Sequence, residues 1–303
     1  MDVSIIIVNY NTRELLYNCL ESIFKYTESI DFEVIISDNG SIDGSIEMVK
    51  KTFPNVILIE NRTNLGFGKA NNIAFAKAKG KYILYLNSDT VFLNNAVKYF
   101  FDYWEDTKDK YNIGAIGANL QNISGEIVSS YGFFPTCKSS LISLIGCILS
   151  MMHLRKPENI RKNKYSSYCG DVDFIIGADL FLKNDEYAVF DERFFMYFEE
   201  TDMQLKMKNN NRKRCIINGP KIIHLSGGSD KNKSTFYSFN KITTKFYWQS
   251  CLEYLYKNDF QKKYIKIITN ILIIILTLPH NRKNNKDFIW ELKTWKAKRL
   301  SKK

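Results

Sequence analysis

The chain has 303 residues and a mass of 35.4 kDa, enough for one large α/β domain with an appendage or for two modest domains. A content of 45% hydrophobic and 14% aromatic residues excludes global disorder. The net charge of +11 is concentrated, because residues 257–303 hold 13 Lys and Arg against three Asp and Glu. A generic nucleic-acid binder more often carries its charge on the folded core, so no nucleic-acid partner is expected. A basic tail beside an apolar stretch suits an anionic membrane surface better.

The six cysteines are scattered, without a Cys-x-x-Cys pair or a histidine spacing typical of zinc sites. We therefore expect reduced thiols in a cytoplasmic environment. Met1 leads directly into an apolar strand, so no signal sequence is expected.

Short apolar runs alternate with longer amphipathic segments over the first 117 residues. Residues 13–26 predict a helix after the cap candidates Asn11 and Thr12. Strict alternation of strand and helix predicts an α/β fold, with a mostly parallel sheet and helices on both faces. The expected strands are 3–8, 32–37, 56–59, 82–86 and 113–117, and the expected helices are 13–26, 43–51, 67–79 and 94–104.

The pattern is less regular after residue 117. Residues 121–136 indicate a hairpin or an irregular excursion, and residues 139–154 form an apolar stretch typical of a helix. Ordered structure is expected again over 171–182, 190–207 and 215–224. From residue 231 onward we expect mainly helices.

Polar side chains follow three of the expected strands. Val8 leads into Asn9, Tyr10 and Asn11, where the absence of glycine argues against a dinucleotide-binding turn. The second strand runs into Asp38 and Asn39, and the fourth into Asn87, Ser88 and Asp89. In an open α/β sheet, ligands collect beyond the carboxyl ends of the strands. Each group alone also fits an ordinary turn.

A glycine-containing loop precedes the third expected helix, with Asn64, Gly66, Phe67 and Gly68 in sequence and Asn71 just beyond. Free N–H groups at a helix N-terminus are a natural anion site. For a single Gly-x-Gly taken alone, a structural turn is the better explanation. Because this loop follows a neighbouring strand of the same sheet, the strand ends together predict a nucleotide-diphosphate pocket.

Three acidic residues, Glu199, Glu200 and Asp202, open an expected helix after an aromatic run at 194–198. Attraction to the positive end of a helix dipole accounts for one or two of these acids. A carboxylate supported by a rigid wall is also what general-base catalysis requires. Downstream, His224 ends an apolar strand, where it is either structural or a metal ligand.

With these motifs in this order, residues 3–230 resemble the family 2 glycosyltransferases, most closely their rhamnosyltransferase-like branch. The resemblance implies a GT-A fold and transfer of a sugar from a nucleotide diphosphate, with inversion at the anomeric carbon and usually with Mg²⁺ or Mn²⁺. It divides the chain into a GT-A domain (1–230) and a helical, basic region (231–303). Within the domain, residues 1–118 are the nucleotide-sugar half and residues 119–230 the acceptor-binding and catalytic half.

The resemblance also implies roles for individual residues. Asp89 and His224 correspond to metal ligands, and Asp38 to the aspartate that binds the base. Glu200 corresponds to the catalytic base, where the family usually has aspartate, and this leaves the choice between Glu200 and Asp202 open, with Glu199 beside them. The nucleotide-sugar-binding set is Val8, Asn9, Tyr10, Asn11, Asp38, Asn39, Asn64, Gly66, Phe67, Gly68, Asn71, Asn87, Ser88 and Asp89.

The resemblance favours dTDP-rhamnose as donor and a glycan acceptor, expected to be lipid-linked, in surface polysaccharide synthesis. UDP-galactose, UDP-galactofuranose and UDP-N-acetylglucosamine remain open as donors, and a non-catalytic nucleotide-sugar-binding protein is the other class of function. We expect a cytoplasmic protein at the inner face of the cell membrane, with its oligomeric state open.

Residues 264–278 form an apolar stretch interrupted by Lys266 and Asn270. It is shorter than the roughly 20 apolar residues of a membrane-spanning helix. It therefore predicts either a core helix or an interfacial helix that lies on the membrane surface with the basic residues around it.

Overall fold

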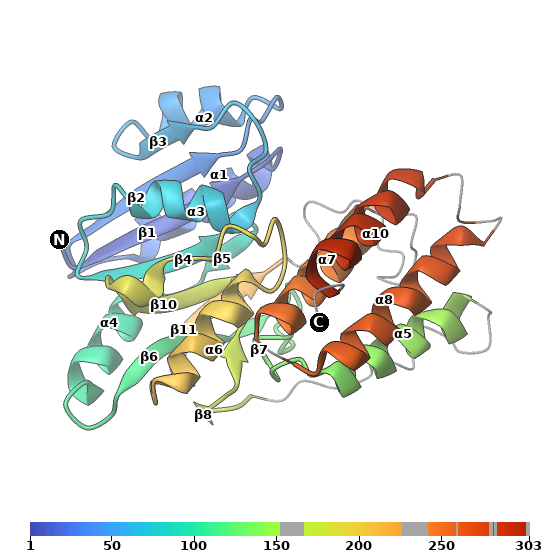
Figure 1. The fold of residues 1–303 in the computed structure, drawn as a ribbon. Helices are drawn as coiled ribbons and strands as arrows, with labels where there is room; N and C mark the ends of the chain where they lie inside the picture. Colours follow the sequence, from blue (N-terminus) through green and yellow to red (C-terminus); the bar gives the residue numbers. More distant parts are fainter. Residues whose placement is uncertain (152–166, 226–241, 259, 279–280, 282–283, 301–303) are drawn as a thin grey trace. The chain divides into compact units, whose positions relative to one another are not determined.

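The computed structural model describes residues 1–151, 167–225, 242–258, 260–278, 281 and 284–300. The chain forms two compact units (Figure 1). Unit 1 contains residues 1–134, 164–195 and 199–233, and unit 2 contains residues 135–163, 196–198 and 234–303. The expected domain boundary at residue 230 lies outside the described residues.

Unit 1 is built on a nine-stranded sheet with the order β3-β2-β1-β4-β10-β6-β11-β5, in which β8 also pairs with β11. β10 is antiparallel to both of its neighbours, and β5 and β8 are antiparallel to β11, so the other six strands share one direction. The strands are β1 (Val3–Asn9), β2 (Phe32–Asp38), β3 (Ile57–Glu60), β4 (Tyr82–Asn87), β5 (Thr90–Phe92), β6 (Ile113–Gln121), β8 (Gly170–Asp171), β10 (Asp179–Lys183) and β11 (Lys213–His224).

Helices cover both faces of this sheet, as the sequence predicted. Residues of α1 (Arg13–Tyr26), α2 (Ser45–Thr52) and α4 (Ala96–Thr107) share one buried apolar cluster with one face of the strands. Residues of α3 (Phe67–Phe75) and α6 (Glu199–Asn209) share a second cluster with the opposite face. Alternate residues of β1 divide between the two, because Ile5 and Ile7 lie in the first cluster and Ile6 in the second.

The excursion expected at 121–136 is largely irregular. It contains β7 (Tyr131–Gly132), which pairs with β9 (Phe174–Ile175) in a separate two-stranded sheet. A short 3₁₀ helix, η2 (Glu186–Ala188), follows β10. Strands from residues 1–118 and from 119–230 belong to the same large sheet, and the division of unit 1 into two functional halves stays a prediction.

Unit 2 is helical. It contains α5 (Cys137–Met151), α7 (Ile242–Lys257), α8 (Lys262–Thr277) and α10 (Lys286–Leu300), together with residues 196–198. Helix α8 buries one face, including Ile265 and Leu272, and exposes Ile274 on the other. No helix among the described residues has the length and apolar character needed to cross a membrane.

Asp179 is an ionisable group in the middle of the sheet, on β10, with no exposed surface. Its Oδ2 accepts a hydrogen bond from the Ala118 N–H at 2.7 Å, and its Oδ1 has no partner among the described residues. Burial raises the pKa of this carboxyl well above its usual range, and the hydrogen bond from Ala118 offsets only part of the effect. Burial therefore favours the protonated, uncharged form of Asp179 in the folded protein.

Asp179→Asn tests this state of the carboxyl. Because the folded pKa lies above the unfolded pKa, wild-type stability should fall relative to the variant as pH rises above about 4. The difference in unfolding free energy should change by about 1.4 kcal/mol per pH unit until the folded pKa is reached. Urea denaturation at a series of pH values measures it, and a difference that does not vary with pH would contradict a protonated Asp179.

Candidate active site

Polar side chains at the carboxyl ends of β1, β2 and β4 are joined in one network. Asn9 donates from Nδ2 to Asp38 Oδ2 at 2.7 Å, and its Oδ1 accepts from the Thr12 hydroxyl at 2.6 Å. The Thr12 hydroxyl also lies 3.0 Å from the hydroxyl of Ser88, which follows β4. The predicted convergence of the ends of β1, β2 and β4 is therefore present as direct contacts.

Asp38 is only 1% exposed, and its carboxylate is largely used by the protein itself. In addition to Asn9, the Gly40 and Ser41 N–H groups donate to Asp38 Oδ1 at 3.1 and 2.8 Å. A carboxylate has about four acceptor positions, so three of them are already occupied. The observed role of Asp38 is to shape the loop after β2, and its contact with a base stays a prediction.

Asn39 connects the end of β2 to the glycine-containing loop. Its Nδ2 donates to the Gly66 carbonyl at 3.0 Å, and its Oδ1 accepts from Asn61 at 3.1 Å. Within the loop, Asn64 Oδ1 accepts from the Gly66 N–H at 3.0 Å. The side chains of Asn39 and Asn64 therefore fix the path of the backbone toward α3.

Gly66 brings this loop against the segment that precedes α6. Its φ is +85°, and a Cβ at this position would lie 2.3 Å from the carbonyl oxygen of Phe195. The next N–H, that of Phe67, donates to the same oxygen at 2.9 Å. Only glycine satisfies both the backbone conformation and the close approach.

The N-terminus of α3 packs beside the acidic segment. A Cβ on Gly68 would lie 3.2 Å from Phe190 Cβ and 3.5 Å from Glu199 Cβ. Asn72 makes two hydrogen bonds with the backbone of Phe190, one to its carbonyl and one from its N–H, both at 2.9 Å. The glycine loop and the acidic helix are therefore parts of one rigid arrangement.

The three acidic residues of α6 differ in exposure. Asp202 is fully buried and its Oδ2 lies 3.6 Å from Lys206 Nζ, whereas Glu199 is 4% exposed. Glu200 is half-buried and lies next to Gly177, where a Cβ would lie 3.9 Å from Glu200 Cβ. Of the three acids, Glu200 is the least buried residue.

The surroundings of Glu200 also change its acidity. Desolvation raises the pKa of its carboxyl from 4.5 to about 7, while hydrogen bonds from its own N–H and from Thr201 lower it by less. A carboxylate with this pKa is a stronger proton acceptor than an ordinary glutamate and is still substantially ionised at neutral pH.

Asp89 and His224 are 135 positions apart in sequence and meet in space. His224 Nε2 lies 3.3 Å from Asp89 Oδ1, and both side chains are mostly buried. The contact results from strand pairing, because His224 is opposite Thr90 in the β11–β5 ladder and the Leu225 N–H donates to the Asp89 carbonyl. The two residues predicted as metal ligands are thus brought together by the sheet.

This pair fits a divalent cation only in part. One carboxylate and one imidazole suit Mn²⁺, and Mg²⁺ is commonly held by one or two carboxylates together with substrate phosphates. No group of three or more His, Cys, Asp or Glu is arranged to hold a metal in the part of the chain that the structure describes. The remaining ligands would have to be phosphate oxygens and water.

The remaining residues predicted to bind the nucleotide-sugar differ in exposure and in their contacts. Tyr10 is 45% exposed and Asn11 Oδ1 accepts from the Ile42 N–H, so both border the loop after β2. Val8 is half-buried on β1, and Asn87 is tied to β10 through its N–H and the Ala178 carbonyl. Asn71, by contrast, is 1% exposed and donates to the Phe67 carbonyl within α3.

Three residues that help to build the site were either not predicted from the sequence or were predicted in another role. Thr12 was expected to cap α1, but its side chain makes no capping hydrogen bond and serves the Asn9 network instead. Ser41 accepts from the Asn9 side chain at 3.0 Å. Gln204 binds both backbone groups of Ile175 and anchors α6, and nothing in its local sequence signals this.

Comparison with known proteins agrees with this arrangement. Residues 4–152 match the family described as Glycosyl transferase family 2. The poly(ribitol-phosphate) beta-glucosyltransferase of Bacillus spizizenii is 32% identical over 141 residues, covering 45% of this chain and 22% of that protein. A UDP-Glc:alpha-D-GlcNAc-diphosphoundecaprenol beta-1,3-glucosyltransferase of Escherichia coli, WfaP, is 36% identical over 107 residues, covering 35% of this chain and 38% of that protein.

Solved structures show the same fold at low sequence identity. S. aureus TarS superposes with a TM-score of 0.56 at 14% identity, over 92% of this chain and 44% of that chain. GalNAc-T7 with UDP, GalNAc and Mn²⁺ superposes with a TM-score of 0.59 at 14% identity, over 95% of this chain and 54% of that chain. The predicted GT-A fold is therefore confirmed.

The comparisons therefore show that about the first half of the chain is similar to family 2 glycosyltransferases. The chain matches only 22% and 38% of the lengths of the two relatives described above. The rhamnosyltransferase-like branch stays a prediction.

Gly66→Ala tests the contact that joins the loop to the acidic segment, with Gly125→Ala as the matched control. Both glycines have positive φ, but a Cβ on Gly125 would meet nothing within 4 Å. The control should lose about 1 kcal/mol of stability through backbone strain, and Gly66→Ala clearly more because its Cβ overlaps a carbonyl oxygen. Urea denaturation measures both losses, and equal losses would show that the close approach is not a constraint.

Proposed function

We propose that the chain is an inverting, metal-dependent hexosyltransferase that moves a sugar from a nucleotide diphosphate to a saccharide acceptor of a cell-surface polymer. The observation that carries this proposal is the 3.3 Å contact of Asp89 with His224, in the same compact unit as Glu200, whose pKa is raised by desolvation. Asp89 and His224 suit the leaving diphosphate, and Glu200 suits the attacking hydroxyl. The family 2 match supports the reaction class.

In the proposed mechanism, Asp89 and His224 are the residues that would hold Mg²⁺ or Mn²⁺. A bound cation supplies positive charge that stabilises the diphosphate as a leaving group. Glu200 accepts the proton of the acceptor hydroxyl while that oxygen bonds to the anomeric carbon on the face opposite the diphosphate. The bond from the anomeric carbon to the diphosphate breaks in the same displacement, so the configuration inverts.

The loops around the carboxyl ends of β1 and β2 are proposed to hold the nucleotide. The exposed Tyr10 offers a stacking surface for the base. Asp38, Asn39 and Asn64 act in this proposal by fixing the loops.

Two classes of donor are considered, a UDP-hexose and dTDP-rhamnose. The predicted dTDP-rhamnose rests on the resemblance of the motifs. The name of the similar protein WfaP includes UDP-Glc, and the structure of GalNAc-T7 was solved with UDP. Both names favour a UDP-sugar as donor. We therefore propose a UDP-hexose first and dTDP-rhamnose as the alternative.

The acceptor is proposed to be lipid-linked, since WfaP is named for a diphosphoundecaprenol-linked saccharide. Such an acceptor places the enzyme at the inner face of the cell membrane. The basic C-terminal region, residues 257–303, is proposed to make the peripheral contact with the anionic surface.

Glu200→Gln should lower turnover by about 10²-fold or more and leave donor binding largely unchanged, because the amide cannot accept the proton. Asp202→Asn is the comparison, since Asp202 is the other candidate base and is buried. Single-turnover transfer and donor titration measure the two effects. A Glu200→Gln enzyme with wild-type turnover would remove Glu200 from the role of base.

The pH profile of wild-type turnover should show an acid limb near pH 7, where Glu200 gains its proton. Below that value the rate should fall about tenfold per pH unit, because only the ionised carboxylate acts as base. Above it, the rate should level off. The residual activity of Glu200→Gln should lack this limb, and an unchanged limb in the variant would assign it to another group.

A panel of UDP- and dTDP-sugars, scored by Mn²⁺-dependent protection against thermal unfolding, identifies the donor. A bound donor should raise stability by roughly 3 kcal/mol at a hundred times its dissociation constant. Asp89→Ala should lose the Mn²⁺-dependent part, and the exposed Asp109→Ala is the control. Selective protection by dTDP-rhamnose would reverse the proposed donor order, and no protection by any sugar would contradict the donor site.

A further inference from the structure

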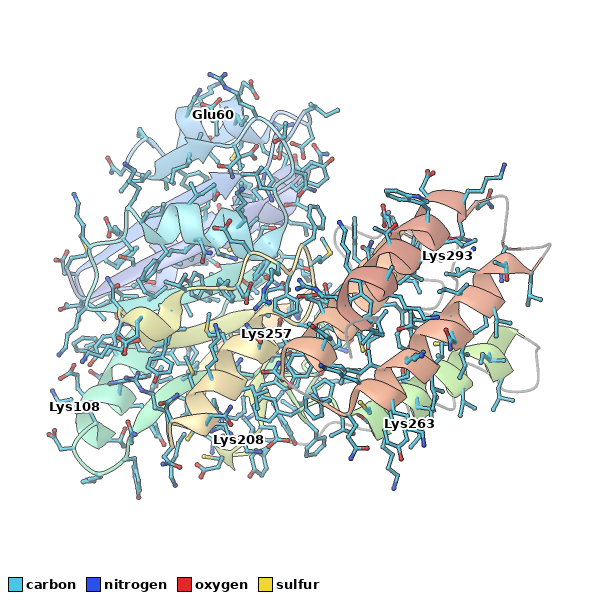
Figure 2. All side chains as sticks on the ribbon, viewed as in Figure 1. Glu60, Lys108, Lys208, Lys257, Lys263 and Lys293 are labelled. Carbon is cyan, nitrogen blue, oxygen red and sulfur yellow. The ribbon has the colours of Figure 1, made fainter. Side chains whose placement is uncertain are left out.

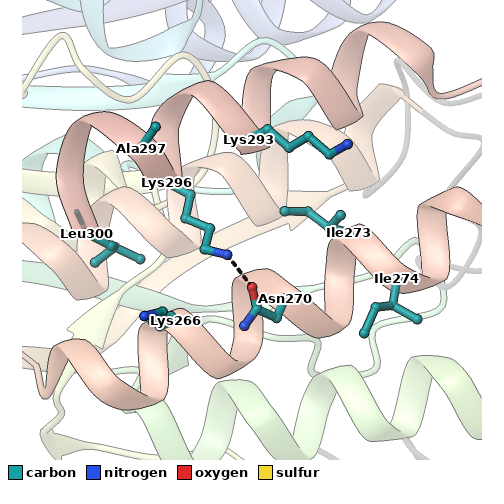
Figure 3. A pocket seen from close by; sticks show the side chains of 8 residues that line it. All are labelled: Lys266, Asn270, Ile273, Ile274, Lys293, Lys296, Ala297 and Leu300. Carbon is teal, nitrogen blue, oxygen red and sulfur yellow. Dashed lines mark hydrogen bonds between the residues drawn. The ribbon is translucent and has the colours of Figure 1, made fainter.

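Helices α8 and α10 of unit 2 enclose a groove of about 590 Å³. Lys266, Asn270 and Ile274 line it from one face of α8, because they are four residues apart. Lys293, Lys296 and Leu300 line it from one face of α10, three and four residues apart. Figure 3 shows Lys296 of α10 reaching Asn270 of α8 across the groove.

The groove is positively charged in the part of the chain that the structure describes. No acidic residue lines it, and none of its three lysines lies within ion-pair distance of a carboxylate in the described part of the chain. Lys296 Nζ instead donates to Asn270 Oδ1 at 2.6 Å, which directs one ammonium group across the groove (Figure 3). The nearby Arg299 differs, because it pairs with Glu253 at 3.1 Å.

Apolar side chains lie directly beside these cations. Ile274 is 62% exposed, and Ile273 and Leu300 complete the apolar part of the lining. The same helices expose further apolar surface at Trp290 and Ile267, which are 68% and 37% exposed. A free phosphate ion would use only the lysines, whereas an amphiphile uses the cations and the apolar surface together.

We propose that this groove binds the phosphate head group of an anionic membrane lipid, with the first part of an acyl chain against Ile274 and Leu300. This inference rests on the membrane contact proposed above and deepens it, because it names the site and the lipid group. The lysine ammonium groups supply the charge, and their stems lie along the apolar lining. Figure 2 shows Lys293 and Lys263 on the helical unit; Lys293 lines the groove and Lys263 does not.

Sedimentation with vesicles of phosphatidylcholine, with and without phosphatidylglycerol, tests the site on the full chain. The groove variant is Lys266→Gln, Lys293→Gln, Lys296→Gln. The control variant, Lys263→Gln, Lys286→Gln, Lys298→Gln, removes the same charge from exposed positions of the same two helices outside the groove. We expect the groove variant to lose at least about tenfold more binding to phosphatidylglycerol vesicles than the control.

The outcomes separate the two proposals. Equal losses in both variants would overturn the groove site and leave general electrostatic attraction to the membrane. No binding of the wild-type chain to any vesicle would overturn the membrane contact itself. The thermal unfolding of both variants is measured as well, so that a loss of vesicle binding caused by a folding defect is recognised.

A second arm distinguishes a lipid from a free phosphate ion. Inorganic phosphate is added against chloride at the same ionic strength. We expect phosphate to displace the chain from phosphatidylglycerol vesicles no more than chloride does. Selective displacement by phosphate, absent in the groove variant, would assign the groove to a free phosphate and overturn the lipid assignment.

Discussion

The candidate active site depends on a backbone contact between Gly66 and Phe195. The carbonyl oxygen of Phe195 occupies the space that any side chain at position 66 would need, and it accepts the Phe67 N–H. Through this contact the loop held by Asn39 and the segment leading to Glu199 become parts of one structure. Neither side could shift without breaking the hydrogen bond or separating α3 from the acidic helix.

The remaining groups are positioned by the ends of strands. Asn9 reaches Asp38 because β1 and β2 are paired in register up to these two residues. Asp89 meets His224 because β11 extends alongside β5. A sheet holds such side chains at little further entropic cost, since the backbone is already fixed by its ladder. Preorganisation of this kind is what electrostatic stabilisation of a leaving group requires.

Local sequence predicted the elements well where local forces decide them. Helix α1 matches its predicted range of 13–26, and β1, β2 and β4 begin where expected. Helix α3 was expected to reach residue 79 but ends at Phe75. Beyond the helix, Gly80 packs closely against β1, where a Cβ would lie 2.4 Å from the Ser4 backbone N. This contact is with a residue 76 positions away in sequence, so no local pattern predicts it.

The same distinction holds for the site. The polar strand ends at Asn9, Asp38 and Asp89 were visible in sequence, and so was the acidic segment. The contact of Asp89 with His224 was reached through resemblance, because pairing between β5 and β11 cannot be read from either strand alone. Thr12 occupies the N-cap position of α1, as the sequence predicted, but its side chain makes no capping hydrogen bond. Its use in the Asn9 network, like that of Ser41, depends on contacts between several loops that local sequence does not show.

The strand order has a consequence for the newly made chain. Strand β10 lies between β4 and β6 and is antiparallel to both, yet it follows β4 by about 90 residues. At a translation rate of roughly 5–20 residues per second, β4 waits about 5–18 s for this partner. During that time its apolar edge is open to pairing with other chains. The centre of the sheet can therefore be completed only after β10 has been synthesised, and until then β4 lacks one of its two partners.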